Sequence, residues 1–446
     1  MMESKKTYGA APFILLAFIY FLVGFLTTVN GQFQGPLKIA FLEDAGSLKN
    51  TFTTSVSFFF FLGYLLNSNL AARWVNVKGY RVTMLRALGV MVIGLLLYEV
   101  STLLVIHFDD VRFVYQGGSV PWGFAVFLIG SFLMGTSAAV LQVVINPYVS
   151  AYNLRGTSPA QRLNITTAVN SFGTTIAPFF VTMVVFSGVS LDDVTSRQLL
   201  VPFVLLALVI FLVTLGAARM ELPDLSSTRA EKGQRLERSI WSFRHLTLGV
   251  MAIFFYVGTE VGIGSNINLY AMELIKNGDG PSFFGMRELI VGNMDMGIPA
   301  LLATLYWGGF LVGRAVSSFY RNFNPRKVLI FTTFVSTLLI LLSVSIKNLW
   351  LLSAVGLFHS VMWSCIFTLA TTGLREYTSK ASGVFMMGVF GGAVFPVLQG
   401  VLADVLGSWQ LTWSIPVICE LVMLAYAVYG YKVTDEWCLN NIHNAN

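Results

Sequence analysis

The chain has 446 residues, of which 55% are apolar and only 11% are charged. The charges gather in short clusters between long apolar blocks, which excludes a soluble globular domain and indicates an integral membrane protein. The formal net charge of +6 does not indicate a nucleic-acid partner, because the basic residues are confined to alternate loops, as the positive-inside rule requires.

The apolar blocks predict membrane-spanning helices. They continue for about twenty or more residues without turn residues, which suits a helix that crosses a bilayer and is too long for a strand of a β-barrel. The fold class expected is therefore an all-α polytopic membrane protein. About twelve spans are expected, at residues 11–30, 51–72, 82–106, 121–148, 164–187, 199–218, 246–270, 298–320, 327–346, 349–372, 381–405 and 410–431.

The loops between the spans alternate in charge. Acids or few charges occupy every second loop, whereas the others are basic. The basic positions are Lys5, Lys6, Arg73, Lys78, Arg81, Arg155, Arg162, Arg321, Arg326, Lys327, Arg375 and Lys380. By the positive-inside rule, both termini are expected in the cytoplasm, and the expected location is a bacterial inner membrane.

A polar, basic segment near the middle of the chain divides the spans six plus six. We expect an N-terminal six-helix bundle at 1–218, a central cytoplasmic loop at 219–244, a C-terminal six-helix bundle at 245–432 and a cytoplasmic tail at 433–446. Two motifs recur with a six-span offset, which predicts duplicated halves around a central pathway, as in an alternating-access transporter. They are Gly63-x-Leu65 with Gly309-x-Leu311, and Phe172-Gly173-x4-Pro178 with Phe390-Gly391-x4-Pro396.

Seven stretches distributed over nearly the whole chain are similar to one known family. They are GFLTTVN (24–30), LQVVINPYV (141–149), RLNITTAVNSFG (162–173), YVGTEVGIGS (256–265), GR (313–314) with NPRKVL (324–329), MWSCIF (362–367) and GGAVFPVLQGVLAD (391–404). With the span order, they resemble the major facilitator superfamily and its fucose permease-like branch, the fucose:proton symporter family. The resemblance implies a twelve-helix carrier that imports a neutral, hexose-like monosaccharide with a cation.

The chain departs from this family at the two acids that handle the coupling proton. Gly31 stands where one acid is usual, directly after the asparagine of span one, and Gln142 stands where the other precedes the Asn-Pro pair of span four. A carboxamide does not exchange a proton near neutral pH, so the coupling ion is left open between a proton and sodium. Ser364 also replaces a usual proline in span ten. No other cofactor is expected.

Glu260, near the middle of span seven, is then the conspicuous ionisable residue within the membrane. A carboxylate there costs several kcal/mol unless it is protonated, paired or hydrated. It is expected to hold the coupling cation, with sodium as one version, or to hydrogen-bond the substrate, or to bond a neighbouring helix. Arg314 is the nearest basic residue by span order, although the family pattern makes it structural. Glycines flank Glu260 and favour close helix packing or local unwinding. They are Gly258, Gly262 and Gly264.

Polar residues recur at helical spacing in several spans and predict a cavity that binds sugar. Carboxamides donate and accept hydrogen bonds, as sugar hydroxyls do, and burying them costs less than burying a charge. A tryptophan ring can stack on a sugar. The candidate substrate-binding residues are Thr28, Asn30, Gln34, Gln142, Asn146, Thr167, Asn170, Asn266, Trp363 and Gln399. The alternative for each is a bond between helices, or lipid contact or packing for the tryptophan.

Three further ionisable residues lie in apolar runs. His359 precedes the span-ten tryptophan by one turn, where a satisfied polar contact is the commoner role. Glu99 and Glu420 match no motif. The cysteines Cys365, Cys419 and Cys438 show no metal spacing and are expected to be thiols.

Other functions remain as alternatives to import. An exporter of small or amphipathic molecules would have a more apolar and aromatic pocket, and a transport-inactive sugar sensor would need a signalling domain, which is not visible. An enzyme is not expected, because no nucleophile with a base, metal cluster or phosphate loop is present in the sequence. The partners expected are the sugar and membrane lipid, and the chain is expected to be monomeric.

Overall fold

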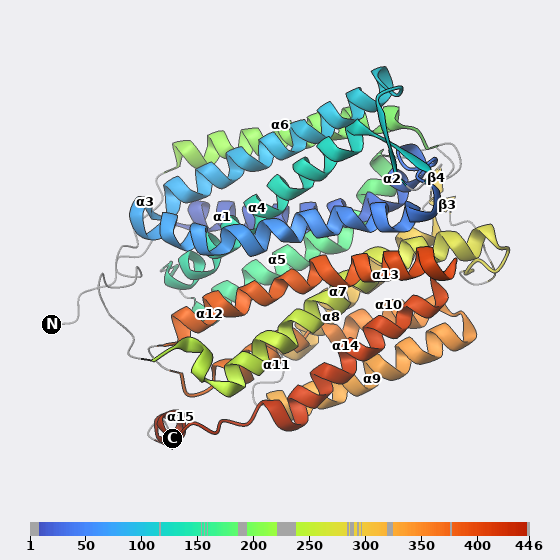
Figure 1. Cartoon of the computed structure of the whole chain (residues 1–446). Helices are drawn as coiled ribbons and strands as arrows, with labels where there is room; N and C mark the ends of the chain where they lie inside the picture. The colour runs from blue at the N-terminus through green and yellow to red at the C-terminus, as the bar shows by residue number, and fades with distance from the viewer. Residues whose placement is uncertain are drawn as a thin grey trace.

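The computed structural model describes residues 9–115, 117–152, 154–155, 157, 159–185, 194–220, 238–282, 285, 290–291, 294–295, 297–318, 324–374 and 377–443. Long helices lie side by side along one axis in two bundles, one from each half of the chain (Figure 1). Both chain ends lie at the same end of the molecule, which we call the terminal end. The opposite end is called the far end.

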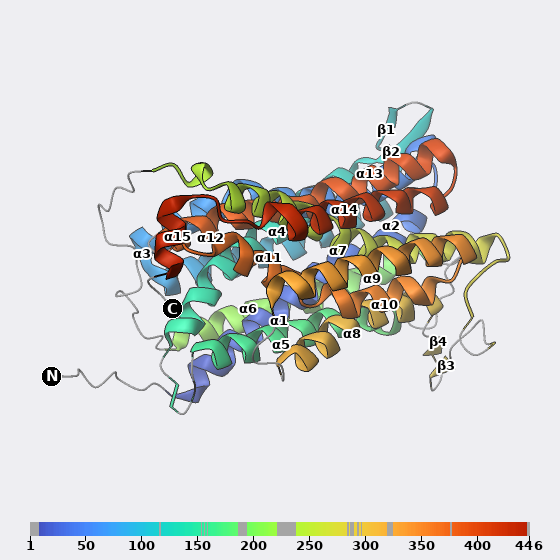
Figure 2. The ribbon, with the colours of Figure 1, turned by 90° about the horizontal axis from the view of Figure 1, so that it is seen from below.

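The N-terminal bundle consists of α1 (Ala10–Gln32), α2 (Gln34–Ala40), α3 (Lys49–His107), α4 (Trp122–Ala151), α5 (Pro159–Phe180) and α6 (Leu200–Arg219). The C-terminal half comprises α7 (Arg244–Lys276), α8 (Ile298–Ser318), α9 (Pro325–Ile346), α10 (Leu349–His359), α11 (Met362–Thr371), α12 (Thr378–Met387), α13 (Gly391–Leu406), α14 (Ser414–Ala425) and α15 (Glu436–His443). Two antiparallel strand pairs lie at the far end (Figure 1, Figure 2). They are β1 (Arg112–Tyr115) with β2 (Gly118–Pro121), and β3 (Ile290–Val291) with β4 (Met294–Asp295).

Eleven helices among the described residues are long and apolar enough to cross a membrane. The predicted second span is the first part of α3, and the third span forms the rest of that element. The two parts meet at Gly79, whose φ of 83° is readily adopted only by glycine. The helical, polytopic fold class predicted from the sequence is therefore confirmed.

Two spans are less regular than their apolar sequences predict. The predicted span ten is broken into α10 and α11, with Ser360 and Val361 between them. The predicted span eleven is α12 followed by a 3₁₀ turn at Gly388–Phe390 and then α13. Span seven shows the opposite behaviour, because α7 is continuous through its glycines, so local unwinding is not found there.

Local sequence signals set several helix ends. The Asn324 side chain accepts hydrogen bonds from the backbone N–H groups of Arg326 and Lys327, and Pro325 occupies the first turn of α9. The Asn348 side chain similarly caps α10. A capping side chain satisfies N–H groups that lack a partner within the helix. The Asn324 cap therefore marks the start of α9, and the Asn348 cap lies in the tight turn between α9 and α10.

The repeated glycines occupy equivalent helix contacts in the two bundles. A Cβ at Gly63 of α3 would clash with the backbone of α4, and a Cβ at Gly309 of α8 would clash with the backbone of α10. Gly173 of α5 contacts the backbone of α1 in the same way, and Gly391 of α13 contacts that of α7. Both motif pairs therefore mark the same close backbone approach, six spans apart.

The predicted tail includes a packed helix at the terminal end. The ring of Trp437 in α15 lies 5.4 Å from that of Tyr377 and 6.1 Å from that of Phe243. Cys438 is buried, and it is a free thiol like Cys365 and Cys419. Several positions named from the sequence lie outside the described residues, namely Lys5, Lys6, Arg321, Arg375, most of the central loop (221–237) and the side chain of Arg73.

Candidate functional site

Glu260 is the ionisable residue around which the site is built. It lies in the middle of α7 and is only partly buried, although the residues on either side of it are buried. The Tyr256 hydroxyl, one turn earlier, is within hydrogen-bonding reach of its carboxylate, and the Arg314 guanidinium of α8 interacts with it electrostatically. The carboxylate therefore has a tyrosine hydroxyl and a cation near it in the C-terminal bundle.

Arg314 connects this carboxylate to the N-terminal bundle. Its guanidinium donates a hydrogen bond to the Ser171 hydroxyl of α5, and its Nε lies 3.5 Å from the Ser360 carbonyl oxygen. It also interacts electrostatically with Tyr20 of α1. The family pattern treats this arginine as structural, but it lies between the bundles beside Glu260.

The two carboxamides of span four contact tyrosines of neighbouring helices. The Gln142 Nε2 donates to the Tyr64 hydroxyl of α3 over 3.0 Å, and Asn146 is within hydrogen-bonding reach of the Tyr20 hydroxyl. Tyr64 is also within hydrogen-bonding reach of Thr27. Both carboxamides are partly exposed although they belong to a membrane span, so they retain capacity to bind a solute.

The span-one residues lie deeper inside the N-terminal bundle. Asn30 is 3% exposed, and its Oδ1 accepts hydrogen bonds from the hydroxyls of Tyr98 and Ser131. Thr28 is also buried, and its hydroxyl has no partner among the described residues. The carboxamide of Asn30 is thus used inside one bundle, and a sugar contact for either residue stays a prediction.

Three other candidates lie on the N-terminal helices. The Asn170 Nδ2 donates to the Tyr20 carbonyl oxygen over 2.7 Å and joins α5 to α1. The Gln34 Nε2 donates to the Ser57 hydroxyl over 2.6 Å and is buried at the far end. Thr167 is partly exposed on α5. The predicted stripes therefore combine helix contacts with exposed positions.

The three remaining candidates lie in the C-terminal bundle. The Asn266 Nδ2 donates to the Gln399 Oε1 over 2.9 Å, and both side chains are fully buried. Trp363 is partly exposed, stacks on Phe367 with ring centroids 5.4 Å apart and meets the edge of Phe385. A sugar contact for the exposed part of its ring stays a prediction, whereas the carboxamide pair forms a contact between α7 and α13.

Gln32 joins the two bundles at the far end. Its Nε2 donates to the Gly264 carbonyl oxygen over 3.0 Å, and its Oε1 accepts a hydrogen bond from the Asn268 Nδ2. All of these groups are buried between α1 and α7. Because buried polar groups held this way are costly to separate, the contact closes this end of the interface.

Asp404, near the end of α13, binds the first turn of α3 in the other bundle. Its carboxylate accepts hydrogen bonds from the backbone N–H groups of Asn50 at 3.0 Å and Thr51 at 2.7 Å, and from the Thr51 hydroxyl at 2.6 Å. A helix N-terminus has unpaired N–H groups and favours a negative charge. We call these three bonds the Asp404 latch.

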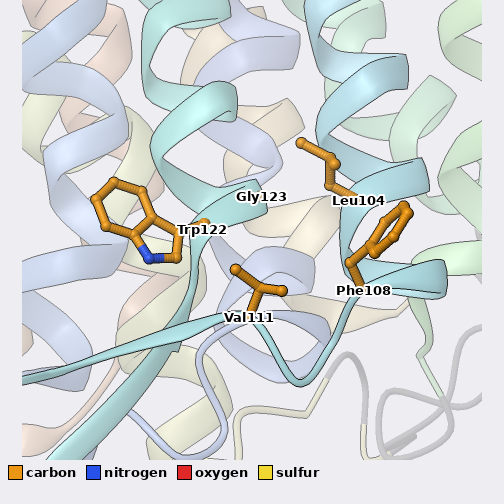
Figure 3. A pocket seen from close by; sticks show the side chains of 5 residues that line it. All are labelled: Leu104, Phe108, Val111, Trp122 and Gly123. Carbon is orange, nitrogen blue, oxygen red and sulfur yellow. The ribbon is translucent and has the colours of Figure 1, made fainter.

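A small hollow elsewhere in the N-terminal bundle is apolar (Figure 3). Its volume is about 230 Å³, and it lies where α3 ends and α4 begins. Its lining residues are Leu104, Phe108, Val111, Trp122 and Gly123. None of the predicted polar candidates lines it, so it is separate from the Glu260 site.

Known transporters match nearly all of the chain, although no family model matches it. The glucose/galactose transporter of Brucella abortus is 31% identical over 436 residues, which are 96% of each chain. The L-fucose-proton symporter of Escherichia coli is 24% identical, over 93% of this chain and 92% of that one.

Solved structures show the same fold. The transporter FucP in its outward conformation matches with a TM-score of 0.63 at 22% identity and covers 95% of this chain and 99% of its own. The inward-open xylose transporter XylE from E. coli matches with a TM-score of 0.67 at 12% identity and covers 98% and 100%.

The two bundles, the polar groups between them and these matches define an integral membrane transporter of the major facilitator superfamily. Within that superfamily, the chain belongs to the fucose permease-like family, with the glucose/galactose transporter of B. abortus.

Proposed function

We propose that the chain imports a neutral, hexose-like monosaccharide together with a cation by alternating access. The observation that carries this proposal is that polar side chains from both bundles stay partly exposed within membrane-spanning helices. These are Gln142 and Asn146 on one side and Glu260 on the other. The names of the relatives, which are sugar transporters, support the substrate class.

In this proposal, the two carboxamides bind sugar hydroxyls and Glu260 binds the coupling ion. Each carboxamide keeps donors and acceptors that its tyrosine partner does not use. Glu260 is the carboxylate beside Arg314, and a cation or proton there would reduce the cost of its burial. Arg314 touches both bundles, so it would respond to ion binding and to bundle movement.

We infer that both termini face the cytoplasm of a bacterial inner membrane, which the alternation of basic loops supports. The far end then faces outward, and the structure is closed on that side through Gln32 and the Asp404 latch. The outward-facing state would require these contacts to separate.

Uptake into proteoliposomes tests the proposal. Labelled glucose, galactose and fucose are supplied with an imposed sodium gradient or an imposed proton gradient, for the wild type and for Glu260→Gln. We expect accumulation of at least one sugar with one of the gradients, and we expect Glu260→Gln to lose ion-driven accumulation. Glu99→Gln is the control, because Glu99 is a carboxyl in another span and lies outside the site.

Each result decides a part of the proposal. Sodium-driven accumulation identifies sodium as the coupling ion, and proton-driven accumulation identifies the proton. Failure of all three sugars with both gradients contradicts sugar import and favours export of another class of molecule. Full accumulation by Glu260→Gln contradicts the role of Glu260 while leaving sugar transport in place.

A further inference from the structure

The break between α10 and α11 lies next to the Glu260 site. Helix α10 ends at His359 and α11 begins at Met362, so the break falls inside a membrane span. Broken helices inside a membrane require other groups to bind the backbone that they free. The partners of this break therefore reveal what it is attached to.

Two carbonyl groups at the break accept hydrogen bonds from residues around Glu260. The Tyr256 hydroxyl donates to the His359 carbonyl oxygen over 3.0 Å, and the Arg314 Nε approaches the Ser360 carbonyl oxygen at 3.5 Å. Both residues also interact with the Glu260 carboxylate. The backbone of the break is thus held by the same groups that surround the ionisable residue.

The His359 side chain makes a second connection to the same place. Its Nε2 lies 2.6 Å from the Glu420 Oε1 of α14, and its Nδ1 lies 2.9 Å from the Tyr306 hydroxyl of α8. The same hydroxyl lies 3.1 Å from the Glu260 carbonyl oxygen. The side chains of His359, Glu420 and Tyr306 are completely buried.

Counting the hydrogens in this series of contacts shows which ring nitrogen of His359 carries a hydrogen. A carbonyl oxygen only accepts, so the single Tyr306 hydrogen points to Glu260, and His359 Nδ1 must carry the hydrogen of its own bond to Tyr306. The contact between His359 Nε2 and Glu420 then contains one further hydrogen. With that hydrogen the pair is neutral overall, whereas its loss or a second proton would bury a net charge.

We propose that His359, held by Glu420, is a positioning residue for the Glu260 site. The pair keeps one shared proton and is not itself the ion carrier. It holds Nδ1–H on Tyr306, which directs the Tyr306 hydroxyl to the backbone of Glu260 and anchors the broken span against α7. This inference rests on the proposed function, because it assigns the coupling ion to Glu260.

The test uses variants that change one contact at a time. Tyr306→Phe removes only the hydroxyl, and Glu420→Leu leaves His359 Nε2 without a partner. Glu420→Gln can donate from its amide to Nε2 and so preserves hydrogen on Nδ1. Tyr98→Phe is the matched control, because it removes a buried tyrosine hydroxyl that binds Asn30 in the other bundle.

Two measurements separate positioning from a general structural defect. Uptake is measured against a series of sodium chloride concentrations at fixed pH, and against a series of pH values with sodium replaced by N-methylglucamine. Counterflow of labelled sugar, with equal saturating ion on both sides, measures sugar exchange without an ion gradient. All variants are first compared with the wild type for a single, symmetric peak in gel filtration.

We expect Tyr306→Phe and Glu420→Leu to raise the half-maximal ion concentration about fivefold, as the loss of one hydrogen bond implies. Counterflow is expected to stay within about twofold of wild type, as are both readouts for Glu420→Gln and Tyr98→Phe. An unchanged half-maximal ion concentration in the first two variants overturns the proposal. So does an equal loss of ion-driven uptake and counterflow, or a Glu420→Gln as defective as Glu420→Leu. A wild type without ion-driven uptake instead overturns the proposed function.

Discussion

Two asparagines of the N-terminal bundle differ in what surrounds them. Asn30 is buried and accepts two hydrogen bonds, whereas Asn146 is partly exposed and contacts Tyr20. Removing a buried acceptor leaves its hydrogen-bond donors unpaired. Removing a partly exposed carboxamide leaves a position that water can fill. The first residue should therefore matter mainly for stability and the second mainly for transport.

Replacing each asparagine by alanine tests this difference. Asn30→Ala is expected to lower the free energy of unfolding by about 1–3 kcal/mol, because the hydroxyls of Tyr98 and Ser131 lose their acceptor. Asn146→Ala is expected to keep the thermal midpoint of the wild type in detergent and to reduce sugar uptake at least about tenfold, the factor for about 1.4 kcal/mol of binding. Wild-type uptake by Asn146→Ala would remove span four from the binding site.

At the residue scale, the sequence identified Glu260 and the polar stripes, but it did not show how each side chain is used. Tyrosines such as Tyr20 and Tyr64 have no distinctive spacing in an apolar run, so their contacts with the span-four carboxamides were not predicted. Arg314 was assigned to a structural motif because its distance from Glu260 depends on how α7 and α8 pack. Spacing along one helix cannot give contacts between helices.

At the element scale, the repeated glycines predict where added volume is not tolerated. Gly391→Ala is expected to destabilise the protein by about 1–3 kcal/mol, because the new methyl group would press on the Phe254 carbonyl group. Gly383→Ala in α12 meets nothing within 4 Å and is the control. Thermal unfolding of both variants in detergent checks this, and equal midpoints would contradict the close contact.

Most helices could be predicted from the sequence, because long apolar runs leave no other way to satisfy the backbone in a bilayer. The repeat was also visible, because the contacting glycines have fixed spacing. The break at His359 was not visible. Residues 357–372 contain no Gly or Pro, and the carbonyl groups that the break frees are bound by Tyr256 and Arg314 from other helices.

At the scale of the whole molecule, polar contacts between the bundles close the far end, together with the packing of α13 against α3. In the Asp404 latch, a carboxylate binds the N-terminus of a helix in the other bundle. The sequence alone did not indicate it, because Asp404 and Asn50 are far apart in the chain. The sequence predicted the two halves of the molecule, but it did not predict which end of the interface between them is closed.

Asp404→Ala is expected to favour opening at the far end. The loss of about 2 kcal/mol of charge-assisted hydrogen bonding shifts the equilibrium by about thirtyfold. The measurement is the rate at which an impermeant maleimide labels Ser265→Cys from outside, in a chain whose native cysteines are replaced by serine. Ser265 is 4% exposed and lies beside Gly31 between the bundles.

Asp279→Ala provides the control for this measurement. Asp279 is an acid at the same end, but it pairs with Lys347 at 2.8 Å within the C-terminal bundle. Its removal should leave labelling unchanged. Equal labelling rates in Asp404→Ala and in the wild type would show that the latch does not hold the far end closed.

The backbone origin of most donors in the Asp404 latch limits which mutations can disable it. Two of its three donors are backbone N–H groups at Asn50 and Thr51, so most side-chain replacements there leave the main contacts in place. The bond between Gln32 and Asn268 is different, because a change at either residue removes it. Substitutions at positions 50 and 51 are therefore expected to have little effect on opening of the far end. Replacement of Asp404 is the change that removes the latch.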